Sequence, residues 1–194
     1  IIETNKNDLA AAEENGVPKT MLDRLLIDEK RISSIQSAIY DLVKLEDPIG
    51  KSEIWSRPSG IELERMRVPL GVVAIIYEAR PNVTVDSAAL CLKTGNAVVL
   101  RGGKEAINTN KALVTVIKSA LTACGFDADA VGLIQSTDRE SANALMSMRG
   151  LVDVLIPRGG KGLITACTEN AKVKYKDQLV DDCHTAHGQG AQLT

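Results

Sequence analysis

Hydrophobic residues gather into two short runs in the middle of the chain, and a segment with helical spacing separates them. The runs Gly71–Tyr77 and Ala97–Arg101 are rich in β-branched residues and are bounded by Gly, Pro or charged positions, as is typical of buried strands. Between them, Thr84–Lys93 places its apolar residues on one helical face, and Gly95 is suited to end that helix. Strand, helix and strand in so short a segment predict a βαβ unit with a right-handed crossover and a parallel sheet.

The segment before this unit has helical spacing, and we expect a layer of three helices. They are predicted at Asn7–Asn15, at Lys19–Leu26 and from Asp28 to about Leu45. The third carries one apolar stripe at three- and four-residue steps, formed by Ile32, Ile35, Ile39 and Leu42. A stripe on one side predicts that this layer packs onto another element.

The period of the pattern changes between Ser52 and Val68. Ile54 and Ile61 lie on either side of the turn at Pro58-Ser59-Gly60, and alternating positions on both sides favour a two-stranded β ribbon. Such a ribbon has free edges with which a partner chain could pair.

The C-terminal half repeats the strand and helix pattern. Strands are expected near residues 131–135 and 152–157, and a further one at Val173–Tyr175. Thr137-Asp138-Arg139-Glu140 has the spacing of a capping box before a helix through Met148, and another helix is expected from Gly162 towards Glu169. The predicted fold class is α/β, a doubly wound, mainly parallel, Rossmann-like sheet with N-terminal helices and a β ribbon.

Composition excludes several classes of protein. The 194 residues are 44% hydrophobic, and 23 Lys and Arg balance 25 Asp and Glu at a net charge of −2, so we expect no nucleic-acid partner. No apolar run reaches the length of a membrane span, and the first residues do not resemble a signal peptide. The cysteines have no CxxC spacing, which favours a reduced, cytoplasmic protein without a metal site; they are Cys91, Cys124, Cys167 and Cys183. We expect Cys91 and Cys124 to act as small hydrophobic residues.

Candidate chemistry follows the predicted strands, because ligands bind at the carboxyl ends of an open parallel sheet. Arg80 could bind a phosphate or a carboxylate, or could form a surface ion pair with Glu78. The second Gly-Gly turn, Arg158-Gly159-Gly160-Lys161, opens a helix whose backbone N–H groups would suit a pyrophosphate, although the two glycines could serve only a tight turn. The GxGxxG arrangement is absent.

Three stretches together resemble a known family. They are RMRVPLGVVAIIYEARPNVTVDSAALCLKTGNAVVLRGGKEAINTN from Arg65, VDVLIPRGGKGLI from Val152, and KNDLAAAEENGVPKTMLDRL from Lys6. They are similar to the nucleotide-binding half of the γ-glutamyl phosphate reductase (glutamate-5-semialdehyde dehydrogenase) family, within the aldehyde dehydrogenase superfamily, over nearly all of residues 3–173. The resemblance implies an aldehyde dehydrogenase type of fold. It also implies a small-molecule reaction in proline biosynthesis, the NADPH-dependent reduction of L-glutamyl 5-phosphate to L-glutamate 5-semialdehyde with phosphate release.

The resemblance also assigns roles to site residues. Asn82 matches the asparagine whose side-chain amide donates to the oxyanion of the tetrahedral intermediate, although an Asx turn after Pro81 would explain it too. Arg101 and Lys104 bracket Gly102-Gly103 where the superfamily holds the adenosine ribose. Two cations there suit the 2′-phosphate of NADP, while the alternative is a solvated turn whose glycines only permit positive φ.

In the family the nucleophile is a cysteine that lies beyond the position of Thr194, and none of the four cysteines matches its motif. Cys183, His184 and His187 are expected to be solvent-exposed rather than to hold a metal. We therefore expect a fragment that binds cofactor at most and does not catalyse by itself.

The expected organisation has four parts: an N-terminal helical layer (1–51), a ribbon that joins a homodimer (52–68), an NADP-binding domain (69–175) and a divergent tail (176–194). The alternatives are a non-catalytic nucleotide-binding or assembly module, and an aldehyde dehydrogenase with another substrate.

Overall fold

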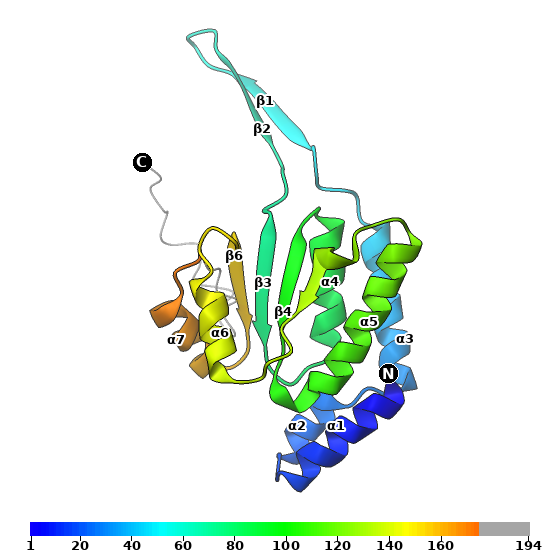
Figure 1. Cartoon of the computed structure of the whole chain (residues 1–194). Helices are drawn as coiled ribbons and strands as arrows, with labels where there is room; N and C mark the ends of the chain where they lie inside the picture. Colours follow the sequence, from blue (N-terminus) through cyan, green and yellow to red (C-terminus); the bar gives the residue numbers. More distant parts are fainter. Residues whose placement is uncertain (175–194) are drawn as a thin grey trace.

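A four-stranded parallel sheet with helices on both faces forms the centre of the chain, as a computed structural model that describes residues 1–174 shows (Figure 1). Its strands lie in the order β5-β4-β3-β6. They are β3 (Val72–Tyr77), β4 (Ala97–Arg101), β5 (Val131–Leu133) and β6 (Val154–Arg158). In the register of the central strand, Ile75 pairs with Leu100 on one side and with Ile156 on the other. The predicted α/β class and the βαβ unit are confirmed.

Both faces of the central strand β3 are buried, which explains why its sequence is a continuous apolar run. Val73, Ile75 and Tyr77 point into a core under α4 and α5, whereas Ala74 and Ile76 point into a second core under α6 and α7. The helices and short 3₁₀ turns of this region are α4 (Asn82–Lys93), η1 (Lys104–Ala106), α5 (Ile107–Ala123), η2 (Ala128–Ala130), α6 (Arg139–Ser147) and α7 (Lys161–Asn170).

Three helices precede the sheet: α1 (Ile2–Glu14), α2 (Lys19–Leu25) and α3 (Glu29–Lys44). Asp28 caps α3 by accepting the N–H of Arg31 at 2.7 Å, so the predicted start of this helix is confirmed. The apolar stripe of α3 packs against α4 but is only half-buried.

The predicted start of α1 at Asn7 is wrong, because the helix begins at Ile2. Its buried face includes the polar residues Asn5 and Asp8, which break the apolar pattern that would have extended the prediction. The Asp8 carboxylate accepts the N–H of Thr109 at 2.7 Å, the Thr109 hydroxyl at 2.7 Å and the amide of Asn108 at 2.8 Å. Since α5 has no side-chain cap of its own, a residue of α1 caps it.

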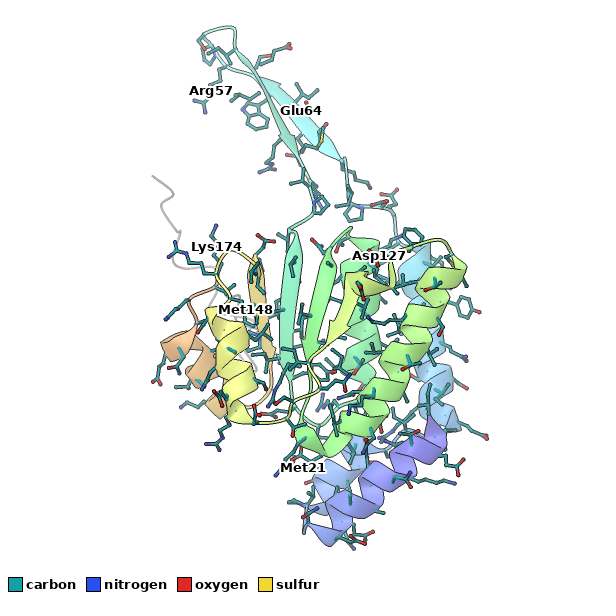
Figure 2. All side chains as sticks on the ribbon, viewed as in Figure 1. Met21, Arg57, Glu64, Asp127, Met148 and Lys174 are labelled. Atoms are coloured by element: carbon teal, nitrogen blue, oxygen red, sulfur yellow. The ribbon has the colours of Figure 1, made fainter. Side chains whose placement is uncertain are left out.

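The predicted ribbon is confirmed as β1 (Ser52–Ser56) paired antiparallel with β2 (Glu62–Met66). Gly60, at φ 84°, allows the tight turn between them. The ribbon leaves from the amino end of the sheet and stands away from the helices, and Figure 2 shows its side chains without covering neighbours near Arg57 and Glu64.

Three smaller expectations are corrected. The N-cap of α6 is Asp138, which accepts the N–H of Ser141 at 2.8 Å, so Thr137 does not begin a capping box. Cys124 is exposed because it lies at the solvent-facing end of α5, and it is not a buried hydrophobic residue. Val173 is buried, and the Lys174 carbonyl accepts the N–H of Leu155 in β6 at 2.8 Å, but neither Val173 nor Lys174 belongs to a strand.

Tyr175 and the expected tail at 176–194 lie outside the described residues. Within residues 1–174, no helix has the length and apolar character that crossing a membrane requires.

Candidate cofactor and substrate site

The strand order creates a crevice at one end of the sheet. From β3 the chain proceeds to β4 and β5 on one side and then returns to β6 on the other side of β3. The loops after β3 and β6 therefore diverge, and such a switch point is where open α/β sheets bind ligands. Helices α1 and α2 lie across this carboxyl end, opposite the ribbon, and Met21 of α2 is labelled there in Figure 2.

A cavity of 330 Å³, here called the cleft, lies at this switch point. Its lining comes from three places: α2, the segment after β3 and the turn after β6. The lining residues are Met21, Arg24, Tyr77, Glu78, Ala79, Arg80, Val83, Arg158, Gly159 and Gly160. The lining contains three arginines and one carboxylate, so the cleft favours an anionic ligand.

The predicted pyrophosphate position at the start of α7 holds a carboxylate of the protein itself. The Gly160 N–H donates to Glu78 Oε1 at 3.0 Å, and Gly160 is the N-cap of α7. A Cβ on Gly159 would lie 2.7 Å from the Glu78 carboxyl group. Neither glycine has positive φ, so the close approach of Glu78 explains Gly159 better than the demands of a tight turn.

A second cavity of 310 Å³, here called the side cavity, lies between α2, α3 and the start of α4. Its lining residues are Asp23, Arg24, Leu26, Ile27, Arg31, Ser34, Ile35, Arg80 and Asn82. Arg24 and Arg80 line both cavities. The predicted site residues Arg80 and Asn82 are thus brought together, and α2 adds Arg24.

Asn82 is the first residue of α4, two residues before the predicted start of the helix. Its amide Nδ2 donates to Asp86 Oδ2 at 3.2 Å, one turn further along α4. Among the described residues no backbone N–H donates to Asn82 Oδ1, so the side chain does not form the alternative Asx turn. Burial raises the pKa of Asp86, while the Asn82 hydrogen bond and the charge of Arg158 oppose that shift. The contact orients the amide of Asn82 and leaves its second N–H for another acceptor.

Arg80 is exposed and forms no ion pair with Glu78 or with any other residue between 1 and 174. The alternative of a surface ion pair is therefore wrong. The Glu78 carboxylate is held at Gly160 instead.

The turn after β4 is separate from both cavities. Arg101 Nη2 donates to the carbonyls of Thr137 and Asp138, each at 2.8 Å, so this guanidinium holds the loop before α6. Lys104 is exposed. Gly102 and Gly103 do not have positive φ, so that alternative is wrong.

Close packing explains Gly102, because a Cβ there would lie 2.3 Å from Asn110 Nδ2 and 3.0 Å from the Tyr77 ring. A buried network beneath this turn had no recognisable signal in the sequence. The Tyr77 hydroxyl lies 2.7 Å from Thr84 Oγ1, which donates to Asn110 Oδ1 at 2.9 Å, so Tyr77 is the donor of the first bond. Burial raises the pKa of Tyr77 to about 12, and the Thr84 hydrogen bond opposes the shift. The network fixes the end of β3 against α4 and α5. The sequence did not indicate Arg24 as a site residue either, because only the fold brings α2 to the carboxyl ends of the strands.

None of the cysteines in the described part of the chain lines either cavity. Cys91 is buried, and burial raises the pKa of its thiol to about 11. No group of three or more His, Cys, Asp or Glu within residues 1–174 could hold a metal. Cys183, His184 and His187 lie outside the described residues.

A doubly wound sheet with an anion-favouring crevice at its switch point is the architecture of nucleotide-binding enzymes. The sequence profile of the aldehyde dehydrogenase family matches residues 1–176, and the chain belongs to that family.

Within the family, the chain is similar to γ-glutamyl phosphate reductases, which confirms the resemblance noted in the sequence. It is 51% identical to that of Moorella thermoacetica over 185 residues, which are 95% of this chain and 44% of the relative. The crystal structure of the Thermotoga maritima protein superposes with a TM-score of 0.86 at 40% identity, over 90% of this chain and 42% of that one. The Saccharomyces cerevisiae protein gives 0.81 at 30% identity, over 90% and 45%. The chain thus spans somewhat under half the length of these relatives.

Proposed function

We propose that this chain is the nucleotide-binding half of a γ-glutamyl phosphate reductase, which reduces L-glutamyl 5-phosphate to L-glutamate 5-semialdehyde with NADPH and releases phosphate, a step of proline biosynthesis. The cationic cleft at the switch point, with Asn82 beside it, carries this proposal. The similarity to proteins of that name supports it.

The chemistry needs a thiolate, and we place it in the part of the relatives that this chain does not span. Attack of the thiolate on the acyl carbon forms a C–S bond and breaks the bond to the phosphate oxygen. Bound at the site, NADPH would supply the hydride for reduction of the resulting thioester, and release of the aldehyde would restore the thiolate. Asn82 donates its free N–H to the oxyanion at the acyl carbon, while Asp86 holds the amide in place. Such a donor contributes about 2.7–4 kcal/mol to transition-state stabilisation.

We assign the preference for NADP mainly to Lys104. This ammonium group is exposed beside the Gly102-Gly103 turn and has no ion-pair partner among the described residues, so it is free to meet a 2′-phosphate. Arg101 supports the turn by holding the carbonyls of Thr137 and Asp138. The donors at this turn fit the phosphate-bearing end of NADP.

Calorimetric titration of the 194-residue chain with NADPH and NADH tests the cofactor assignment. In the Lys104→Ala variant we expect NADPH to bind about 5- to 30-fold more weakly and NADH to bind equally well, since only NADPH carries the 2′-phosphate. Lys30→Ala on α3 is the matched control. If a folded wild-type chain binds neither nucleotide, or if Lys104→Ala weakens both equally, the assignment fails.

We also propose that the β1–β2 ribbon joins two copies of the protein. Ile54 is 67% exposed and Trp55 43% exposed, and the ribbon edges have no partner strand among the described residues. Sedimentation velocity should show dimers whose fraction rises with concentration, and Ile54→Asp should shift the chain towards monomer. A wild-type chain that stays monomeric at high concentration contradicts this assignment.

A further inference from the structure

Two arginines from distant parts of the chain share the wall between the cleft and the side cavity. Arg24 lies in the last turn of α2, and Arg80 lies in the segment that joins β3 to α4. Each lines both cavities. The two side chains therefore border the same two cavities, although they come from segments more than fifty positions apart in the sequence.

Neither guanidinium has a hydrogen-bond or ion-pair partner within residues 1–174, and the same holds for Arg158, which lines only the cleft. Arg31, Arg65 and Arg101 each donate to a carboxylate or to backbone carbonyls. Arg24 and Arg80 have neither a hydrogen bond nor an ion pair from their side chains.

The two carboxylates that line these cavities form no ion pair with Arg24 or Arg80, and each is held by another group. Asp23 accepts from the Arg31 guanidinium at 2.9 Å. Glu78 accepts from the Gly160 N–H at 3.0 Å. Arg31 also donates to the Leu26 carbonyl at 2.8 Å, which fixes the corner between α2 and α3 and leaves Arg24 facing the cavities.

We propose that Arg24 and Arg80 form a two-arginine clamp for the phosphoryl group of the acyl phosphate substrate. This deepens the function proposed above and rests on it. Two permanently charged planar forks match a phosphoryl dianion better than a single carboxylate charge. Bound there, the phosphoryl group lies between the two cavities, with Asn82 beside it in the side cavity. The acyl chain occupies the side cavity, and its apolar lining at Leu26 and Ile35 suits methylene groups.

The phosphate that the clamp would hold could also come from NADPH, so the experiment separates the two sources. Inorganic phosphate and acetyl phosphate are titrated into the 194-residue chain and followed by calorimetry, with acetate as the carboxylate control. NADPH is titrated in parallel. The variants are Arg24→Gln, Arg80→Gln and, as the matched control, Arg57→Gln at the exposed tip of the ribbon. Circular dichroism confirms that each variant is folded.

We expect Arg24→Gln and Arg80→Gln each to weaken inorganic phosphate and acetyl phosphate at least about tenfold, since each removes charge-assisted hydrogen bonds. Arg57→Gln should leave both unchanged, and NADPH affinity should change less than twofold in Arg24→Gln. If phosphate binds as tightly to Arg24→Gln as to the wild type, or if the folded wild type binds neither probe, the clamp does not exist.

If NADPH weakens as much as acetyl phosphate in Arg24→Gln, the arginines serve the cofactor and the proposal is overturned. A chain that binds acetyl phosphate through the clamp but binds no nucleotide would support the clamp while contradicting the cofactor assignment.

Discussion

The cap that α1 supplies to α5 makes a quantitative prediction about stability. Asp8 is 3% exposed, and its carboxylate accepts three hydrogen bonds from the first turn of α5. One donor is the backbone N–H of Thr109, which has no partner within its own helix because it belongs to the first turn. The change Asp8→Ala leaves that N–H buried without an acceptor.

The magnitude follows from these contacts. A hydrogen bond to a charged group contributes about 1.5–3 kcal/mol, and leaving a buried donor unpaired costs about 1–3 kcal/mol. The carboxylate also interacts with the positive end of the α5 dipole, for about 0.3–1 kcal/mol. Because the three bonds share one anchor and are not additive, we expect Asp8→Ala to lower the free energy of unfolding by about 3–5 kcal/mol.

Urea unfolding followed by circular dichroism measures this loss. Glu3→Ala is the matched control, because Glu3 is an exposed carboxylate on the same helix and should change the stability by less than about 0.5 kcal/mol. Asp8→Asn keeps the shape but loses the charge, and should fall between the two. A loss below about 1 kcal/mol for Asp8→Ala, with an unchanged urea dependence, would falsify the capping role of α1.

Three further outcomes follow from the site and the core. At pH 8, iodoacetamide should modify the exposed Cys124 and spare the buried Cys91. The pKa of Cys91, about 11, leaves only about one thousandth of its thiol ionised at that pH. Peptide mass mapping that finds both cysteines labelled equally would contradict this. Burial raises the pKa of Asp86 above 3.8, so the folded state holds that proton more tightly than the unfolded state. The free energy of unfolding of the wild type, compared with that of Asp86→Asn, should therefore fall as pH rises from about 3.8 through the raised pKa. Urea denaturation at several pH values measures this difference, and an increase with pH would refute the assignment. Gly102→Ala should lower the free energy of unfolding in urea by about 1–3 kcal/mol, because the added Cβ would collide with Asn110 and Tyr77. Gly162→Ala is the control, since Gly162 has open space around it and the change should not destabilise α7. Equal effects of the two changes would argue against tight packing at Gly102.

The sequence by itself determined the central architecture. The βαβ unit, the ribbon and the end of α4 at Gly95, with φ 69°, were all predicted correctly. These features depend on local chemistry: the two-residue period of a strand, the 3.6-residue period of a helix and the freedom of glycine at positive φ. Each of these features is therefore determined by residues that are close together in the sequence.

Only the tertiary structure decided which polar groups act together. Asp8 caps a helix 101 residues away, and Arg101 holds carbonyls 36 and 37 residues away. For the same reason, Arg24 of α2 was missed as a companion of Arg80. A side-chain hydrogen bond depends on the position of its partner in the fold as well as on the residue type. The hydrophobic period of a segment indicates its secondary structure but not which distant residue will lie beside it. The site therefore depends on the position of α2 across the carboxyl ends of the strands, which only the tertiary structure sets.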